Sequence, residues 1–496
     1  MRRGNVNIQL VILVIYISLL VVVSVIANRI QSKHGSGAAE YLLAGRKLPA
    51  LMIATMLAGL AIGGASTVGV AQNAYTQGLS AGWYNAAWGV AGIVVGIFAA
   101  KYLRRIEVVT IPEMMGKMFG PGARILGAIA QLLIMMVITS LQYVAGGAVL
   151  AALLPDIFTF HSGMVATAAL FVGIAVAGGY LAGGLASIIN VIVIYGGICA
   201  ALISSLNSVG GMENLVISMP VGAPWFDWVS GVGIAVVAAW MVVMVTQAFS
   251  VQAISQIAFA ARDEKAAQKG FILGGMIIIP VGFLCAMFGI IAAYKFPGLQ
   301  NSAMALPTLM TSISPLIGGI FLAALWAADI STAVALLLGS VTLVLEDIWK
   351  RISHRTLSEK QEILVSRIII LFVSAFTFIL AITSVSILKT ITSALAVMVS
   401  FTILILVNLI APRLCKRISG FWTILTSLLI WVAWTFIPQV RIVPHVIYLE
   451  WPVCLGVFLL TSILGKEPAH DILESKRKEE LPHIELNKGE ALIEEV

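Results

Sequence analysis

The stretch Ile62-Gly63-Gly64-Ala65-Ser66-Thr67-Val68-Gly69 lies near the middle of the second long apolar segment of this chain of 496 residues. Small residues crowd it where a membrane-spanning helix would normally carry leucine, isoleucine or valine. A helix that loosens here can turn bare carbonyl groups and the N-terminus of a half-helix towards a cavity. The stretch therefore predicts a broken helix that can hold an ion and a solute at mid-membrane.

The composition of the chain is that of a membrane protein. Hydrophobic residues make up 60% of the sequence and charged residues 11%, and the mean hydropathy is +1.02. No soluble domain needs so much apolar surface, and the apolar segments are close to the ~20 helical residues that cross about 30 Å of hydrocarbon. We therefore expect an all-α polytopic membrane protein.

Thirteen membrane-spanning helices are predicted from the apolar segments. They are expected at residues 8–27, 49–74, 82–101, 125–154, 163–178, 184–206, 230–251, 271–294, 315–345, 365–384, 390–411, 420–437 and 451–465. The first follows Arg2 and Arg3 as a secretory signal would. It is longer than a typical signal core and lacks a persuasive cleavage site, so we interpret it as a retained span.

The distribution of basic residues predicts the orientation. With the N-terminus outside, most of the 30 Lys and Arg residues fall on the cytoplasmic side, as the positive-inside rule expects. The net charge of +7 then reflects topology and attraction to anionic lipid headgroups, and not a nucleic-acid partner. The sequence predicts a multi-pass protein of the cell membrane with a cytoplasmic C-terminus.

Spans two to six and seven to eleven form two sets of five. An odd repeat length makes the second set enter the membrane from the opposite side, which is an inverted-repeat arrangement. The predicted parts are an N-terminal peripheral helix and cytoplasmic loop at 1–48, a first repeat at 49–206, an extracellular loop at 207–229, a second repeat at 230–411, two peripheral helices at 412–465 and a cytoplasmic tail at 466–496. The predicted core is thus five plus five helices, some of them broken.

The four cysteines show no paired spacing. Cys199, Cys285, Cys415 and Cys454 all lie in or beside apolar segments, where small packing residues are the expected role. No His, Cys or carboxylate cluster lies at a shared depth, so a membrane enzyme is the least favoured class. We expect no cofactor and no disulfide.

Span nine carries a pair of hydroxyl side chains. Ala328, Ser331 and Thr332 stand at i, i+3 and i+4, so one helix face holds two hydroxyls beside a carbonyl. Hydroxyl and carbonyl oxygens can replace the hydration of a sodium ion without adding a fixed charge. Ser and Thr in membrane helices also bond back to their own carbonyls or pack against a neighbour, which is the structural alternative.

From about residue 35 to 411 the chain resembles the sodium:solute symporter family, whose members include proline, pantothenate, sialic-acid and sugar transporters. The resemblance rests on the order and spacing of five stretches. They are Ala39 to Arg46, Thr110-Ile111-Pro112-Glu113, Gly178 to Ala182, Gln252 to Gly270, and Leu322 to Arg351. It implies the thirteen-span topology with the N-terminus outside that the apolar segments also predict.

The resemblance implies a sodium site. Its ligands would be the carbonyls of Ile62, Ala65 and Ala328 and the hydroxyls of Ser331 and Thr332.

Family members that use a second sodium place an Asp in the span after the Gly-Gly motif, where this chain has Ser187. Such members are also expected to carry hydroxyl residues shortly after the Ser-Thr pair, where this chain has Val334 and Ala335. We therefore expect one sodium per solute.

Asp329 is the most unusual residue of the chain, because a carboxylate within a membrane span is costly and usually faces a cavity or a partner. It is a candidate for coupling. The residue could supply charge near the sodium, bind a cationic group of the solute or carry a proton. The structural alternative is that water or a backbone amide lies near enough to make it merely tolerated.

The solute cavity is expected between the broken second span and span seven. The candidate solute-binding residues are Gly63, Gly64, Ser66, Gln142, Gln247 and Ser250, because a few convergent polar groups in an apolar pocket suit a small polar solute. Trp83 and Tyr84 belong either to this cavity or to an interfacial aromatic belt.

The glycine pair leaves room and backbone amides for a carboxylate, which favours an amino acid or a small organic acid over a sugar. Proline-transporting relatives carry Asp where this chain has Gly64, so we do not expect a proline transporter.

The sequence thus predicts a symporter whose partners are a small-molecule solute, sodium and the lipid bilayer. A proton-coupled transporter of the same fold, using Asp329, is one alternative, and uptake at low sodium that rises with acid pH would identify it. A non-transporting solute sensor is another, which transport in vesicles would decide. The sequence carries no signal for an oligomeric state.

Overall fold

The structure is a computed structural model that describes residues 46–106, 108, 110–177, 180–220, 222–353, 359–383 and 386–470, with a few isolated positions between 11 and 22. The predicted first span at 8–27 and most of the predicted tail at 466–496 lie outside the described residues.

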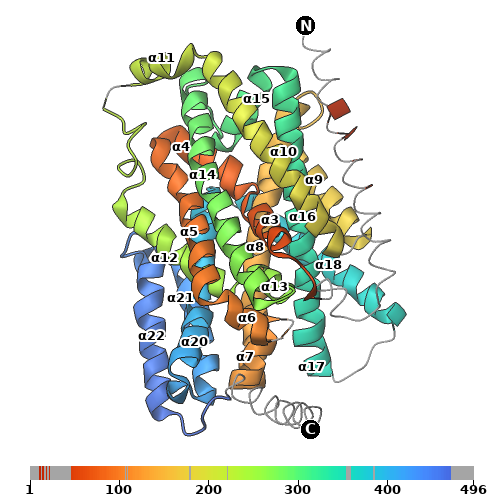
Figure 1. Cartoon of the computed structure of the whole chain (residues 1–496), viewed down its shortest axis with the longest axis vertical. Coiled ribbons are helices and arrows are strands. Elements are labelled where there is room, and N and C mark those ends of the chain that lie inside the picture. Colours follow the sequence, from red (N-terminus) through yellow and green to blue (C-terminus); the bar gives the residue numbers. More distant parts are fainter. Residues whose placement is uncertain are drawn as a thin grey trace, which may run out of the picture.

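The described residues form helices and no β-strand, and most of the helices run along the long axis of the molecule (Figure 1). The long helices are α5 (Trp83–Phe98), α8 (Pro121–Leu153), α9 (Phe160–Ala177), α10 (Tyr180–Asn207), α12 (Ile234–Ser250), α14 (Glu264–Lys295), α16 (Pro315–Thr342), α18 (Glu359–Thr383), α20 (Met398–Ile410), α21 (Arg417–Phe436) and α22 (Ile447–Leu464). The shorter helices are α3 (Ala50–Ala61), α4 (Val70–Gln77), α6 (Ala100–Ile106), α7 (Ile111–Phe119), α11 (Gly211–Ser218), α13 (Gln252–Phe259), α15 (Ala305–Ser312), α17 (Lys350–Ser353) and α19 (Ile387–Leu395).

Every predicted span from residue 49 onward coincides with one of these helices or with a consecutive pair. By length and composition, eight helices of the described part can cross a membrane, or up to ten if each bent pair counts as one span. The all-helical membrane architecture is therefore confirmed, and the total of thirteen spans stays a prediction. The segment predicted as a loop at 207–229 contains the short helix α11.

The second span is broken where the small residues predict it. Helix α3 ends at Ala61, and Ile62 leaves the helical region with φ −93° and ψ 68°. The chain resumes as a π-helix over Ala65–Gly69 and continues as α4. Because the ordinary hydrogen-bond ladder is interrupted here, polar groups from other helices can approach the backbone.

Span seven is broken as well, which the sequence did not indicate. Helix α12 ends at Ser250 and α13 starts at Gln252, with a bend of 51° between them. The first span of each predicted repeat is therefore interrupted. Span eleven is also divided, between α19 and α20.

Close approach of α5 and α14 depends on glycine. A Cβ atom at Gly89 would lie 2.5 Å from the Gly275 carbonyl oxygen, and one at Gly275 would lie 2.4 Å from the Gly89 carbonyl oxygen. The two backbones thus touch where neither residue has a side chain, as small residues permit in membrane helix pairs. Helix α14 also packs against α3 and α4, so it supports the broken second span on both sides of its break.

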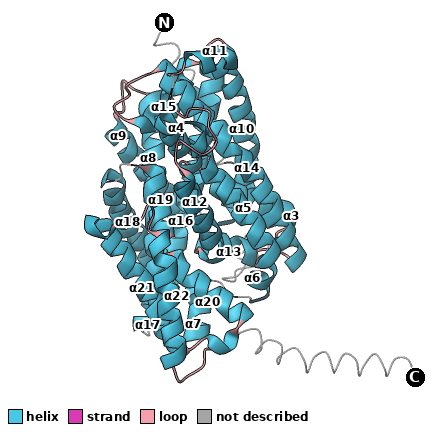
Figure 2. Cartoon of the chain, turned by 90° about the vertical axis from the view of Figure 1, so that its left-hand side faces the viewer, coloured by secondary structure: helices cyan, strands magenta, loops and turns pink. Residues whose placement is uncertain are grey.

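The last two helices, α21 and α22, lie side by side and pack on α20 (Figure 2). His445, directly before α22, joins this pair to α19. The backbone N–H of Ile447 donates to Nδ1 of His445 at 3.2 Å, and Nε2 lies 3.1 Å from the Thr392 hydroxyl. A ring that accepts at Nδ1 and donates at Nε2 is neutral.

We expect this histidine to make the protein sensitive to acid. Burial lowers the pKa of His445 to about 4, whereas an unfolded histidine titrates near 6.5. The folded state therefore binds the proton less readily, and stability falls by about 3 kcal/mol as pH drops from about 6.5 to about 4. Melting temperatures in detergent across this pH range should fall less steeply in His445→Gln than in the wild type. The exposed His161→Gln is the control, and equal slopes in the two variants would contradict the prediction.

Candidate functional site

One long helix, α8, supplies a glutamine to each of the two broken spans. Gln131 and Gln142 are both buried and stand eleven residues apart, which is about three helical turns, so they share one face of α8. The sequence singled out Gln142 but not Gln131. Nothing in the local pattern marks Gln131, because its role depends on a partner more than a hundred residues away.

At the first break, Gln142 accepts a hydrogen bond from the backbone of the interrupted helix. The N–H of Gly64 donates to Gln142 Oε1 at 3.1 Å. The backbone N–H groups of Ser66 and Thr67 both point to the Gly63 carbonyl, and the Ser66 hydroxyl donates to the carbonyl of Ala61. Ser66, a predicted solute-binding residue, therefore directs its side chain to its own broken helix.

At the second break, Gln131 bridges the gap in the ladder. Its Nε2 donates to the Ser250 carbonyl at 2.7 Å, and its Oε1 accepts from the Gln252 N–H at 3.1 Å. The amide thus replaces backbone bonds that the bend removes, which matters because buried backbone groups without partners are costly.

The structure does not bring Ser250 to the predicted cavity. Its hydroxyl lies 3.1 Å from the Thr402 hydroxyl and 3.3 Å from the Met398 carbonyl oxygen. It faces α20 and is not among the residues that line the cavity, so its predicted role in binding the solute has no support from the geometry.

A cavity of about 40 Å³ lies between the two breaks. It has room for a few water-sized groups, so a larger solute must push the lining side chains apart. Its lining is largely apolar, and the polar side chains in it are Gln142, Gln247 and Tyr84. The full lining is Leu60, Ala61, Gly63, Ala65, Tyr84, Trp88, Ile138, Gln142, Gln247, Val251, Ala253, Ile254, Leu336, Ile391 and Leu395.

Three of the predicted solute-binding residues therefore line one cavity, namely Gly63, Gln142 and Gln247. Gly64 is not in the lining, but its N–H donates to Gln142. Trp83 is not part of the lining, and its Nε1 donates to the Trp228 carbonyl at 2.7 Å. The sequence missed Trp88 and Ile391, since an apolar residue in an apolar helix gives no signal of its own.

Helix α16 packs directly against the break in the second span. Asp329 Oδ1 lies 3.6 Å from the Cβ position of Gly63 and 3.3 Å from that of Gly64. Ala328 and Thr332, on the same helix, are buried. The side chains of Ser331 and Ser187 lie outside the described part of the structure.

The two halves of the predicted sodium site thus come from adjoining segments. Ile62 and Ala65 flank the break, and both are buried. Asp329 contacts Gly63 and Gly64, which lie between Ile62 and Ala65. Asp329 stands three residues before Thr332 on α16, so this part of α16 lies beside the break.

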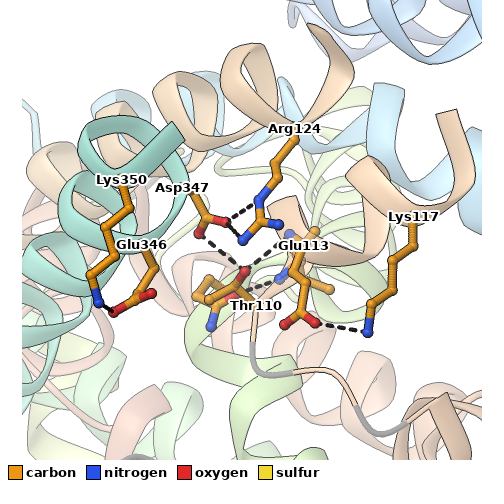
Figure 3. A network of polar contacts seen from close by, with 9 residues as sticks. Thr110, Glu113, Lys117, Arg124, Glu346, Asp347 and Lys350 are labelled. Atoms are coloured by element: carbon orange, nitrogen blue, oxygen red, sulfur yellow. Dashed lines mark hydrogen bonds and ion pairs between the residues drawn. The ribbon is translucent and has the colours of Figure 1, made fainter. Parts of the chain in front are cut away.

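A buried ion pair lies near the end of the molecule where Figure 1 shows α7 and α17, and its contacts are drawn in Figure 3. The Asp347 carboxyl is fully buried and accepts from Arg124 Nε and Nη2, both at 2.7 Å from Oδ1, and from the Thr110 hydroxyl at 3.1 Å. Thr110 also accepts from the Glu113 N–H and so begins α7. The next residue, Ile111, donates its N–H to Gln252 Oε1 at 2.7 Å. The second break is therefore connected to the ion pair through the start of α7.

Comparison with known proteins identifies a family of transporters. The sequence profile described as "Sodium:solute symporter family" matches residues 41–437. The chain is 23% identical to the sodium/glucose cotransporter of Vibrio parahaemolyticus over 384 residues, which cover 70% of each chain. It is 24% identical to the high-affinity proline transporter PutP of Bacillus subtilis over 371 residues, which cover 70% of this chain and 76% of the relative.

Among solved structures, that of a Na+-coupled sialic acid symporter in a substrate-bound outward-open state matches with a TM-score of 0.74. The alignment covers 94% of this chain and 99% of that chain at 17% sequence identity. This likeness shows a shared fold.

Proposed function

Because the chain belongs to the sodium:solute symporter family, we propose that it couples the inward flow of one sodium ion to the uptake of a small polar solute. The observation that carries this proposal is the contact between α16 and the broken second span. It places the Asp329 carboxyl against the glycines of the helix break, on the same helix as the buried Thr332. Backbone carbonyls freed at such a break are oxygen ligands that suit a hard cation.

In this proposal the sodium ion is held by the carbonyls of Ile62, Ala65 and Ala328 and the hydroxyls of Ser331 and Thr332. The solute lies in the adjoining cavity beside Gly63, Gln142 and Gln247. A sodium ion moving down a membrane potential supplies about 2.3 kcal/mol per 100 mV, to which its concentration gradient adds.

Alternating access follows from the same elements. Sodium that binds across the contact between α16 and the second span favours the arrangement in which the two touch. Movement of the core helices then exposes ion and solute to the other side of the membrane. We propose that the protein lies in the cell membrane with its N-terminus outside and its C-terminus in the cytoplasm, as the basic residues indicate.

Thr332→Ala is expected to weaken sodium binding by about tenfold or more, because an interaction with a charged partner contributes about 1.5–3 kcal/mol. The measurement is the rise in melting temperature of purified protein with sodium concentration, with choline keeping the ionic strength constant. Thr342→Ala is the matched control, because the Thr342 hydroxyl on the same helix donates to the carbonyl of Leu338 at 3.2 Å. If both variants respond to sodium like the wild type, Thr332 is not a ligand.

The number of ions is tested separately. Once a solute is known, the charge and sodium carried per solute in proteoliposomes should correspond to one sodium ion. A ratio of two sodium ions per solute would contradict the proposed stoichiometry. It would require a second sodium site, although Val334 and Ala335 have no hydroxyl group to offer as a ligand.

A proton-coupled transporter of the same fold is the second candidate. Asp329 favours it, since this carboxyl is buried and accepts no well-aligned hydrogen bond from the described residues. Uptake that persists when choline replaces sodium, and that rises as the outside becomes more acidic, would select the proton over sodium.

A further inference from the structure

Asp329 is a buried carboxyl with both oxygens unsatisfied. The side chain is 1% exposed. The Gly64 amide lies near the carboxyl but donates to Gln142 Oε1, and neither Oδ1 nor Oδ2 accepts a well-aligned hydrogen bond from the described residues. An ionised carboxylate in an apolar setting is several kcal/mol less stable than in water unless a cation or hydrogen-bond donors accompany it. Binding of a proton, or of a positively charged or hydrogen-bond-donating ligand, would therefore stabilise this carboxyl.

The oxygens of Asp329 and Gln142 converge on the glycine pair. Asp329 Oδ1 and Gln142 Oε1 lie 3.6 and 3.3 Å from the Cβ position of Gly63, and 3.3 and 3.2 Å from that of Gly64. A side chain at Gly63 would stand among these oxygens, whereas one at Gly64 would first meet Ala145. Glycine keeps the space at Gly63 open, and Gly63 and Gln142 also line the cavity, so the Asp329 carboxyl and the cavity share two neighbours.

This geometry disfavours a solute carboxylate at the glycine pair, which the sequence alone favoured. The N–H of Gly64 already donates to Gln142 Oε1, so that amide is not available to an anion. A solute carboxylate placed there would also face the Asp329 carboxyl, and the two groups repel each other when both are ionised. None of the residues lining the cavity is Lys, Arg or His, so the lining offers no cation to offset the repulsion.

An ammonium group has the opposite requirements. It carries three donors and no acceptor, and it finds acceptors in the two Asp329 oxygens and in Gln142 Oε1. Hydrogen bonds between an ammonium and a carboxylate are among the stronger ones in proteins, and more so away from water. The rest of the lining, including Leu60, Ile138 and Leu395, suits an apolar body.

We propose that the transported solute carries an ammonium group, which binds to Asp329 and Gln142 beside the Gly63–Gly64 pair, while its apolar body occupies the cavity. The solute class is a small amine or an amino acid with an apolar side chain, and it excludes carboxylic acids that lack an amine. This inference rests on the proposed transport function and specifies the solute for that site.

The test compares molecules that share one body and differ in their charged groups. Leucine, isoamylamine and isocaproate form one such set, and phenylalanine, phenethylamine and hydrocinnamate another. The melting temperature of the purified full-length protein is measured with each compound, in sodium and in potassium. The amino acid or the amine of at least one set should stabilise in sodium, and the acids should not. Stabilisation by the acids, or by no amine and no amino acid, would overturn the proposal.

Variants of Asp329 separate its charge from its shape. Asp329→Asn should weaken the response to the amine by about tenfold or more, whereas Asp329→Glu should keep part of it. Asp156→Asn removes an exposed carboxylate and should change nothing. If Asp329→Asn binds the amine as tightly as the wild type, Asp329 is not its partner.

The same titrations distinguish a wrong solute class from a wrong function. If sodium alone stabilises the wild type but no amine or amino acid does, the solute inference fails and the sodium site stands. If sodium has no effect on the wild type with any compound, both the proposed sodium coupling and the solute inference fail.

Discussion

Arg124→Ala is expected to destabilise the fold by about 3–5 kcal/mol, because it leaves the carboxylate of Asp347 buried without its cation. Asp347 has no exposed side-chain surface, and the Arg124 side chain is 15% exposed. Among the described residues, the Thr110 hydroxyl alone would remain to satisfy the carboxylate. Loss of the pair should also loosen the start of α7 and, through Gln252, the second break. The measurements are the melting temperature and the yield of monodisperse protein in detergent.

The exposed ion pair of Arg105 and Glu264 provides the matched control. Its side chains are 55% and 37% exposed, and pairs of this kind contribute about 0–1 kcal/mol. Arg105→Ala should therefore unfold close to the wild-type temperature. Combining Arg124→Ala with Asp347→Asn should recover part of the loss, since no bare charge is then buried. Equal melting temperatures for Arg124→Ala and Arg105→Ala would contradict the role given to the buried pair.

Gly64→Ala is expected to abolish or greatly reduce transport, because the new Cβ atom would lie 2.3 Å from the Cβ atom of Ala145. Two non-bonded carbon atoms do not tolerate that distance, so the break must move away from α8. Overpacking of this kind costs about 1–3 kcal/mol in a well-packed core. The movement would also separate Gly64 from Gln142 and displace the carbonyls proposed to hold sodium. Sodium-dependent stabilisation of the purified protein measures this effect before a solute is known.

A size exchange tests the cause. Ala145→Gly combined with Gly64→Ala removes the contact and should restore most of the sodium response. Gly173→Ala is the control, because a Cβ atom at this glycine of α9 would have no neighbour within 4 Å. If the double variant behaves like Gly64→Ala alone, something other than contact with α8 fixes the position of this glycine.

The two glutamines of α8 give these predictions a common structural basis. Gln142 binds the break in the second span and Gln131 binds the break in span seven. Each replaces a backbone hydrogen bond that a continuous helix would have made for itself. A single rigid helix therefore sets the positions of both broken spans relative to each other. Movement at one break has a direct path through α8 to the other, and through Gln252 and Ile111 to the ion pair of Asp347.

The sequence by itself determined the membrane architecture and the first break. Apolar runs of sufficient length specify spans because the bilayer imposes its thickness on each helix separately. The run of small residues from Gly63 to Gly69 specifies the break because helix propensity is also local. The Thr110 to Glu113 motif likewise has a local part, since Thr110 caps the helix that follows it.

Only the tertiary structure decided which polar side chains meet. Gln131 bonds to residues 119 and 121 positions later, Ser250 turns to α20 instead of the cavity, and Asp329 lies against the glycines of another span. These outcomes depend on the rotation of each helix about its axis and on the bend at Val251. Rotation and bend are fixed by how the helices pack on one another, and the periodicity of a uniformly apolar helix carries no information about them.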